Sequence, residues 1–269
     1  MPPGRLGNLI QSINRRRLFA LTGAAALSLG AAPLRVLADD PEPVYGLTRW
    51  QTPARREADA QLAPFGSYKS GVMLRLKPVV DDDRWYRVVH DRYRIYPNWA
   101  FSSGPIFVRT NGIDLVHEDD IAPVAPREGA SDQMIEVILT WPQRVIAWEG
   151  SQMVRETLAS AGRIYPTPTG HFRVFRKRWA RHMQGVDDGV PWDLPGVPYT
   201  MYFTGAGHAI HGTYWHNDFG NARSHGCVNI PTDEAKWFYR WVQPTVTDFG
   251  TEEYLARGDD PRTQVHVHW

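Results

Sequence analysis

Cysteine is almost absent from this 269-residue chain, because Cys227 is the only one. A single cysteine excludes an internal disulfide, so in an exported protein the thiol is either free or bridged to another molecule. Net charge is nearly absent too, since 30 Lys and Arg residues offset 29 Asp and Glu residues. No basic block with interleaved aromatic residues occurs outside the N-terminal segment, which argues against a nucleic-acid-binding protein. No stretch beyond residue 38 is long and apolar enough to span a bilayer.

Aromatic residues, proline and glycine are plentiful instead: the chain has 11 Trp, 11 Tyr, 21 Pro and 23 Gly. This composition favours a mainly β fold with many turns. Aromatic side chains on such a fold either fill the core or form a surface for sugar or peptide ligands. The length permits one large domain or two modest ones.

Residues 1–38 have the pattern of an export signal. Arginines precede an uncharged run over residues 18–34 that is rich in Ala, Gly and Leu, and Val36-Leu37-Ala38 is suited to cleavage before Asp39. Arg16-Arg17-Leu18-Phe19 resembles a twin-arginine export signal. An uncleaved N-terminal anchor is the alternative. We therefore expect a protein of the cell envelope, with membrane contact only in transit or through an uncleaved signal.

Three further regions follow the signal. Residues 39–69 are predicted to be a linker or N-terminal arm, with a short helix over residues 55–62. Residues 70–127 are predicted to form a small β-rich domain, with strands at 72–76, 85–89, 98–101 and 106–108. The strand at 85–89 and the segment 120–124 resemble bacterial SH3-like modules. The third region, residues 132–269, is predicted to be a second β-rich domain that contains Cys227.

Within this region, alternation and turn residues predict strands at 134–140, 145–148, 199–203 and 263–268 and a helix that begins at 231–234. The strand at 199–203 is expected to be half-buried. The proline- and glycine-rich stretch 180–198 is expected to be a long lid or binding loop that carries Trp192 and Asp193. His266 and His268 are expected on one exposed face of the last strand, with metal ligation as the alternative reading.

Four of the ten histidines lie within twenty residues of the only cysteine: His208, His211, His216 and His225. A thiolate nucleophile needs a neighbouring group that activates it, and an imidazole can accept the thiol proton and later return it to a leaving group. Glycine next to the cysteine lets a substrate approach the backbone, whose N–H groups can stabilise an oxyanion. A zinc site built on His208, His211 and Cys227 or His225 is the second hypothesis, although the spacing matches no common zinc motif. Chance clustering is the third.

The motif itself favours the nucleophile. Ile210-His211-Gly212, a spacer, and Ser224-His225-Gly226-Cys227-Val228-Asn229 closely resemble the signature of the L,D-transpeptidase (YkuD) catalytic domain family. The strand from Ile135, the turn at Gln143, the loop 167–170 with Phe172 and the segment 196–203 also resemble pieces of that domain. The resemblance covers residues 132–243, extends toward 269, and does not inform on residues 39–127. Asn229 departs from it, since many members carry arginine there.

The resemblance implies a YkuD-like β-sandwich with the cysteine at the end of a buried cleft and a short helix after it. Cys227 is then the nucleophile and His211 the general base and acid, while Ser224, His225 and Gly226 shape the site and its oxyanion hole. The implied substrates are peptidoglycan stem peptides: the third residue of a tetrapeptide acylates the thiol, the terminal D-alanine leaves, and an amine of a second stem attacks the thioester. The resemblance implies no metal and no other cofactor.

The remaining residues near the motif are assigned by position. His208 and His216 are expected to be structural. Tyr214, Trp215, Arg223, Asn229 and Trp192 are candidate substrate-binding residues. An L,D-carboxypeptidase that passes the same thioester to water stays open, as do two functions of other classes, a zinc hydrolase and a non-catalytic wall-binding protein that works through residues 70–127.

Overall fold

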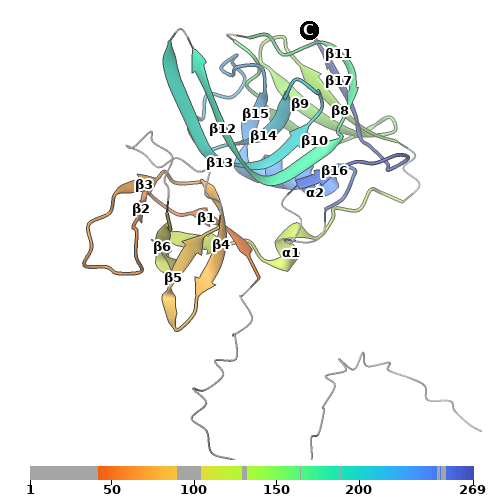
Figure 1. Cartoon of the computed structure of the whole chain (residues 1–269). Coiled ribbons are helices and arrows are strands. Elements are labelled where there is room, and N and C mark those ends of the chain that lie inside the picture. The colour runs from red at the N-terminus through yellow and green to blue at the C-terminus, as the bar shows by residue number, and fades with distance from the viewer. Residues whose placement is uncertain are drawn as a thin grey trace, which may run out of the picture. The chain divides into compact units, whose positions relative to one another are not determined.

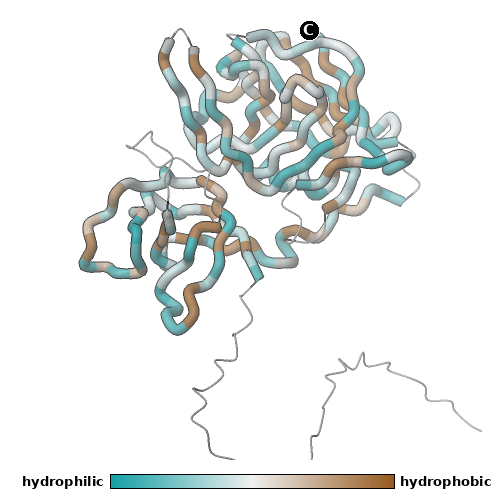
Figure 2. The backbone as a smooth tube through the Cα atoms, viewed as in Figure 1, coloured by the Kyte–Doolittle hydropathy of each residue, from teal (hydrophilic) through white to brown (hydrophobic). Residues whose placement is uncertain are grey.

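The computed structural model describes residues 42–89, 104–128, 132–163, 165–187, 189–246, 249 and 253–269. The predicted export signal over residues 1–38 and the strand expected at 98–101 lie outside these residues. The described part is mainly β, as predicted, with three five-stranded sheets, one two-stranded sheet and few helical residues (Figure 1). Hydrophobic and hydrophilic residues alternate along many of the strands (Figure 2), which is the pattern of sheets with one face in a core. In this part of the chain no helix has the length and apolarity to cross a membrane.

The first sheet has the order β6-β5-β4-β1-β7. Its strands are β1 (Val44–Thr48), β4 (Met73–Val79), β5 (Asp82–Val88), β6 (Phe107–Arg109) and β7 (Ile113–Leu115). Strands β2 (Thr52–Ala54) and β3 (Gly66–Tyr68) pair separately, and two short helices, η1 (Thr110–Gly112) and α1 (Glu118–Ile121), complete this part. The expected strands at 72–76, 85–89 and 106–108 are therefore confirmed to within a few residues, and the resemblance to an SH3-like module stays a prediction.

The expectation of a linker over residues 39–69 is wrong for its structured part. Strand β1 lies inside the first sheet, between β4 and β7, and the helix expected over 55–62 does not form. The reason is tertiary pairing: β2 and β3 hydrogen-bond to each other on either side of this segment, and Arg55 Nε donates to the Leu62 carbonyl oxygen at 2.9 Å. Local helix propensity is a weak preference that such pairing overrides.

The second sheet has the order β10-β9-β8-β17-β11. Its strands are β8 (Gln133–Ile138), β9 (Arg144–Glu149), β10 (Gln152–Leu158), β11 (Gly170–Arg173) and β17 (Gln264–His268). The predicted strands at 134–140, 145–148 and 263–268 are confirmed. His266 and His268 share a face, as expected, but that face is half-buried: the His266 ring stacks on His171 with ring centroids 4.1 Å apart, and His268 Nε2 lies 2.8 Å from a Glu136 carboxylate oxygen.

The third sheet has the order β15-β14-β13-β12-β16 and carries the cysteine motif. Its strands are β12 (Arg176–Asp187), β13 (Val190–Tyr202), β14 (Ala209–Thr213), β15 (Val228–Pro231) and β16 (Glu253–Leu255). Residues 180–198 are therefore not a loop, because they belong to a long β12–β13 hairpin that extends past the other strands of the sheet (Figure 1). Strand β14 pairs only with Met201 and Tyr202 of β13. The proline-bearing part of β13 thus pairs on one side only, where a missing N–H is tolerated.

Strand β13 is also more buried than its alternation indicates. Tyr199, Thr200, Met201 and Tyr202 are all at most 5% exposed, so the expected half-buried strand is in fact covered on both faces. Helix α2 (Thr232–Trp241) packs against β13 and β14 and provides one of these covers. The predicted start of this helix and its buried face are confirmed, since Ala235, Phe238, Tyr239 and Trp241 are buried.

Lys177 on β12 holds the end of this helix. Its side chain is 0% exposed, and Nζ donates to three carbonyl oxygens, those of Tyr239 at 2.6 Å, Val242 at 2.9 Å and Pro244 at 2.9 Å. Burial lowers the pKa of Lys177 to about 7, while three acceptors at the negative end of the helix dipole match the three N–H groups of an ammonium. Lys177 thereby ties the hairpin to the helix that packs behind the cysteine motif.

Candidate active site

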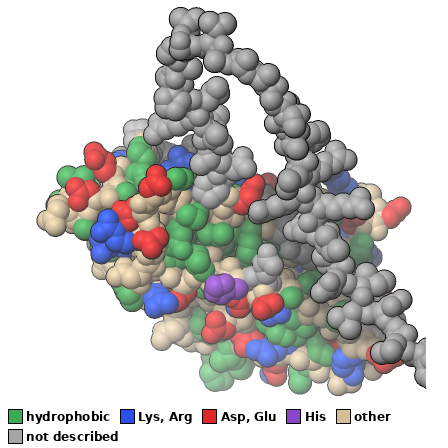
Figure 3. Space-filling model, turned by 90° about the horizontal axis from the view of Figure 1, so that it is seen from below, with side chains coloured by type: hydrophobic (Ala, Val, Ile, Leu, Met, Phe, Trp, Pro, Cys, Tyr) green, Lys and Arg blue, Asp and Glu red, His purple; other side chains and the backbone are tan. Residues whose placement is uncertain are grey.

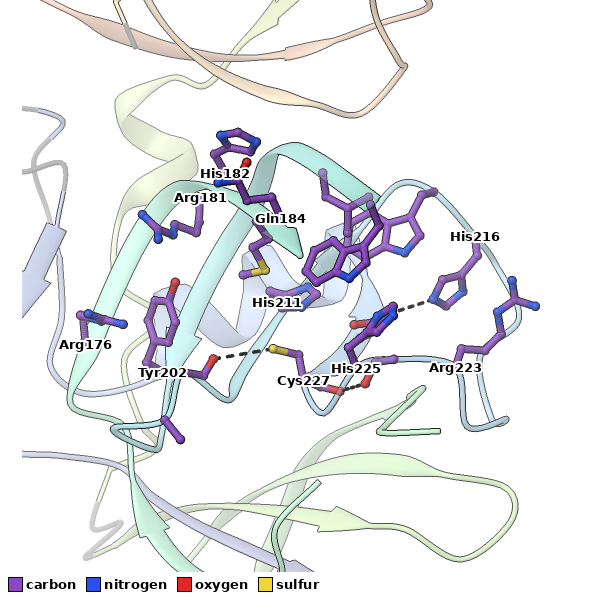
Figure 4. Close-up of a pocket in the computed structure, with 18 residues that line it drawn as sticks. Arg176, Arg181, His182, Gln184, Tyr202, His211, His216, Arg223, His225 and Cys227 are labelled. Carbon is purple, nitrogen blue, oxygen red and sulfur yellow. Dashed lines mark hydrogen bonds between the residues drawn. The ribbon is translucent and has the colours of Figure 1, made fainter. Parts of the chain in front are cut away.

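One cavity of about 930 Å³ lies over the third sheet. Strands β12, β13 and β14 and the loops on either side of β14 supply its walls (Figure 4). Most of the candidate residues from the sequence motif meet there: Cys227, His211, Ser224, His225, Asn229, Trp215, Arg223 and Trp192.

Sheet register brings the cysteine and histidine together. Strands β14 and β15 pair in parallel, with Ile210 opposite Val228 and His211 opposite Asn229, and Cys227 immediately precedes β15. Gly212 faces the helix, because a Cβ atom there would lie 3.3 Å from Cβ of Ala235. Successive side chains of a strand point to opposite faces, so His211 points away from the helix and into the cavity. Figure 4 shows its ring above the thiol of Cys227.

The His211 ring is held in one orientation and one tautomer. Its Nδ1 lies 3.1 Å from the Gly212 carbonyl oxygen, to which it donates, so the lone pair resides on Nε2. The side chain is 2% exposed. This burial lowers the pKa of His211 to about 4, with a smaller opposing effect of the Gly212 hydrogen bond. At neutral pH the imidazole is therefore uncharged and able to accept a proton.

Cys227 is half-buried and uncharged at neutral pH. Its thiol donates to the Gly207 carbonyl oxygen, with Sγ and the oxygen 3.8 Å apart (Figure 4). Burial raises the pKa of Cys227 to about 11, and the Ala209 backbone N–H acts in the opposite direction. The resting pair is thus a neutral thiol and a neutral imidazole, and nucleophilic attack requires the proton to leave sulfur during the reaction.

The turn that carries Cys227 is braced by Ser224. Its hydroxyl donates to the Cys227 carbonyl oxygen and accepts the Gly226 N–H at 3.0 Å. The Gly226 N–H is therefore not free to hold an oxyanion, because it already donates to Ser224. A contribution of the Cys227 N–H to an oxyanion hole stays a prediction.

Gly226 is required by conformation and by space. Its φ is +111°, and a Cβ atom there would lie 3.0 Å from the His208 ring. The His208 Nδ1 atom is bound to the Thr204 hydroxyl at 2.8 Å. His208 therefore packs behind the cysteine turn. Thr167 of the rigid loop braces the same turn, because its hydroxyl donates to the Gly226 carbonyl oxygen at 2.9 Å.

His216 lines the cavity, although the sequence placed it among structural residues. Its Nδ1 accepts the Asp218 N–H at 3.3 Å, and its Nε2 lies 2.9 Å from the Asn229 side-chain amide. The Asn229 atom that faces His216 Nε2 is the amide nitrogen Nδ2, and this contact holds the ring at its end of the cavity. Burial lowers the pKa of His216, and the charge of Arg223 acts in the same direction.

The aromatic candidates separate into two groups. Trp192 of the hairpin stacks on His225, with ring centroids 4.9 Å apart, and Trp215 lies 5.7 Å from the His211 ring. Tyr214 does not line the cavity: its hydroxyl donates to the Pro195 carbonyl oxygen at 2.6 Å, and its Cβ faces Gly71 in the turn before β4. The expectation that Tyr214 touches substrate therefore has no support in its position.

Four titratable residues of the cavity lining escaped the sequence reasoning: Arg176, Arg181, His182 and Tyr202. All four lie on the β12–β13 hairpin or its continuation. His182 pairs with Asp193, and both side chains are at most 7% exposed. These residues could have been found from polar residues that face each other across a hairpin. Such pairs cannot be identified when the segment is interpreted as a loop. Across the described ranges, no group of three or more His, Cys, Asp or Glu residues is arranged to hold a metal ion.

The family of the L,D-transpeptidase catalytic domain (YkuD) matches residues 132–267, about half of the 269 residues. The chain therefore belongs to this family.

Individual relatives match over shorter stretches. Probable L,D-transpeptidase 3 of Mycobacterium tuberculosis is 33% identical over 92 residues, which are 31% of this chain and 34% of that protein. L,D-transpeptidase 1 of the same species is 31% identical over 96 residues, 33% of this chain and 38% of that protein. The chain thus spans about a third of the length of the curated relatives it matches. Among solved structures, the catalytic domain of the E. faecium L,D-transpeptidase is 28% identical with a TM-score of 0.38, covering 51% of this chain and 97% of that one.

Proposed function

We propose that this chain is an exported peptidoglycan L,D-transpeptidase that cross-links stem peptides through a thioester on Cys227. The observation that carries the proposal is the shared cavity, into which both the thiol of Cys227 and the imidazole of His211 open. The cavity is large enough for a peptide segment on either side of the thiol. The position in the cell envelope rests on the signal-like sequence of residues 1–38.

The proposed first step acylates the enzyme. His211 Nε2 accepts the thiol proton while Sγ attacks the carbonyl carbon of the third stem residue. The bond from that carbon to the nitrogen of the terminal D-alanine then breaks, and the His211 imidazolium returns the proton to the departing amine. The low pKa of His211 suits this return, because a weakly basic imidazole gives up its proton readily.

The proposed second step releases the acyl group. An amine of a second stem attacks the thioester carbonyl, its proton passes to His211, and the thiolate leaves and is reprotonated. Water in place of the amine gives a trimmed stem and an L,D-carboxypeptidase. Trp192 and Trp215 narrow the cavity beside the reacting pair, which supports exclusion of water in favour of the amine. Arg223 and Asn229 are proposed to contact the stems at the end of the cavity next to His216.

The test is intact-mass spectrometry on the full chain after incubation with a stem tetrapeptide and, separately, with a carbapenem as an acylating probe. Wild type is expected to gain one acyl adduct in each case, and Cys227→Ala to gain none. Cys227→Ser is the matched control, since it keeps the size of the side chain but not its nucleophilicity. An adduct on Cys227→Ala rejects the nucleophile. Products of extended incubation with muropeptides distinguish cross-linked dimers, which the proposal expects, from trimmed monomers, which indicate the carboxypeptidase.

A further inference from the structure

The charged groups of the cavity all have one sign. Among its described lining residues there is no Asp or Glu, whereas three arginines are present: Arg176, Arg181 and Arg223. Histidines line the cavity as well, but His211 is uncharged at neutral pH and His182 pairs with the carboxylate of Asp193. On the face of the molecule in Figure 3, by contrast, acidic and basic side chains are interspersed. In a chain whose net charge is only +1, this separation concentrates positive potential where a ligand binds and favours an anionic one.

Two of the arginines meet at one end of the cavity around Tyr202. Arg176 is the cross-strand partner of Tyr202, and its guanidinium lies 3.9 Å from the centre of the tyrosine ring. Arg181 lies further along β12, and Figure 4 shows the Tyr202 hydroxyl pointing toward the Arg181 side of the ring, with Arg176 beside the ring. Burial raises the pKa of Tyr202, and the positive charges of Arg181 and Arg176 oppose this shift. The hydroxyl is therefore a hydrogen-bond donor at neutral pH.

One described carboxylate, that of Glu253, pairs with the arginines of β12 at this end of the cavity. Glu253 of β16 is shared by two arginines, since its carboxylate binds Arg178 and lies 3.4 Å from Arg176 Nε. Arg181 has no ion pair or hydrogen bond with any residue that the structure describes, and the same is true of the Tyr202 hydroxyl. The donors of Arg181 and of the Tyr202 hydroxyl are therefore available to a ligand that enters the cavity. Planar guanidinium donors match the geometry of a carboxylate.

We propose that Arg181, with Arg176 and the Tyr202 hydroxyl, binds a carboxylate group of the acyl-donor peptide and makes the enzyme selective for stems that carry this group as a free acid. The inference rests on the proposed function. Two carboxylates of a tetrapeptide donor have the required chemistry: the terminal carboxylate of D-alanine, and a side-chain carboxylate on the third residue where that residue is a diamino diacid.

The placement of this end relative to the thiol supports an assignment to the donor peptide. In Figure 4 Cys227 lies between the Arg176–Arg181 end and Arg223. A peptide bound with its reacting carbonyl at Sγ therefore reaches one end of the cavity, and the second peptide enters from the other. Arg223 already pairs with Asp218 at 3.3 Å, whereas Arg181 has no such partner among the described residues.

The experiment measures kcat/KM for acyl-enzyme formation on the full chain with three tetrapeptides. One donor has both carboxylates free, one has the terminal carboxylate converted to an amide, and one has the third-residue carboxylate converted to an amide. Wild type is expected to prefer the free acid over one of the amides by about tenfold or more. The amide that loses rate identifies the carboxylate. Arg181→Gln is expected to abolish that preference, and Arg181→Lys to retain part of it. Arg173→Gln, which removes an exposed arginine of β11, is the matched control and should keep the full preference.

Two results overturn the inference. Equal rates of wild type with all three donors exclude a carboxylate subsite while leaving the proposed function intact. An equal loss on acid and amide donors in Arg181→Gln assigns Arg181 to structural support only. The absence of an acyl-enzyme with every donor rejects the proposed function and this inference together. The salt dependence of the wild-type preference is a further measurement that needs no variant. The preference for the free acid should decrease between about 50 and 500 mM KCl, because salt screens partly exposed charges.

Discussion

The Sγ atom of Cys227 lies 3.8 Å from the carbonyl oxygen of Gly207, and that oxygen accepts the thiol proton. Among the described residues this carbonyl, not the His211 imidazole, is the hydrogen-bond partner of the thiol. A carbonyl acceptor stabilises the protonated form, and burial acts in the same direction on the pKa of Cys227. The resting enzyme therefore differs from cysteine enzymes that store a thiolate–imidazolium pair.

This difference predicts the pH dependence of thiol alkylation. The rate of carboxamidomethylation of Cys227 by iodoacetamide should rise about tenfold per pH unit from pH 7 toward pH 10, because the thiolate fraction grows until the pH reaches the raised pKa, about 11. Intact mass against time at each pH provides the measurement. A rate that is constant between pH 6 and pH 8 would show a stored thiolate and refute the neutral pair.

Removal of the base should slow acylation without preventing folding. His211→Gln keeps an amide that can donate to the Gly212 carbonyl oxygen but cannot accept and return a proton. We expect the rate of acyl-enzyme formation to fall by about 10²- to 10⁴-fold. His171→Gln, on the exposed side of the second sheet, is the control and should react like wild type. If His211→Gln retained a tenth or more of the wild-type rate, another group would have to be the base.

Burial of His211 also predicts that acid destabilises the fold. The pKa of His211 in the folded chain is about 4, below its ordinary value of 6.5, so the unfolded chain takes up the proton first as the pH falls. The stabilisation is complete above pH 6.5 and is lost progressively between pH 6.5 and pH 4, a change of about 3 kcal/mol for this residue. Urea unfolding at several pH values measures the slope. His211→Gln should flatten it, and an unchanged slope in that variant would contradict the assignment.

Lys177→Met should destabilise the protein by about 3 kcal/mol, because it leaves three buried carbonyl oxygens without a donor. Lys236→Met is the matched control. Lys236 pairs with Asp120 through side chains that are 29% and 35% exposed, and loss of such a pair should cost about 1 kcal/mol or less. Thermal and urea unfolding of both variants make the comparison, and similar losses would argue that the buried lysine is not a structural clamp.

Gly226→Ala should disturb both the fold and the cysteine turn. The substitution forces a side chain into positive φ and to within 3.0 Å of the His208 ring, at a cost of about 1–3 kcal/mol. We expect a lower melting temperature and slower acylation by the carbapenem. Gly205→Ala is the control, because no atom lies within 4 Å of its Cβ position and its φ is not positive. Equal behaviour of the two variants would remove the requirement for glycine at position 226.

Short-range sequence patterns correctly predicted several strands, the start of one helix and most residues of the cavity. Alternation located β8, β9 and β17, the Pro-Thr-Asp-Glu sequence located the start of α2, and the motif located the residues that meet in the cavity. The motif predicts a contact between residues sixteen positions apart because its own sequence forms the two neighbouring strands, β14 and β15, that position His211 and Cys227.

Tertiary pairing decided the parts that the sequence did not reveal. The prolines at 191, 195 and 198 are typical of loops, and they are compatible with β13 only because that part of the strand pairs on one side. The strands β1 to β3 are three to five residues long and too short for periodicity to detect. The role of Ser224 on the Gly226 N–H and the cluster around Tyr202 require side-chain geometry that no spacing rule contains.

The parallel pairing of β14 and β15 makes the spacing of the reacting groups a property of the backbone. Main-chain hydrogen bonds keep Ile210 opposite Val228, so the histidine and the cysteine need no movement of the chain to meet. It follows that a slip of β15 by a single residue would inactivate the enzyme with every side chain of the motif still present. Hydrogen exchange along β14 and β15 therefore reports directly on whether the geometry of the site is intact.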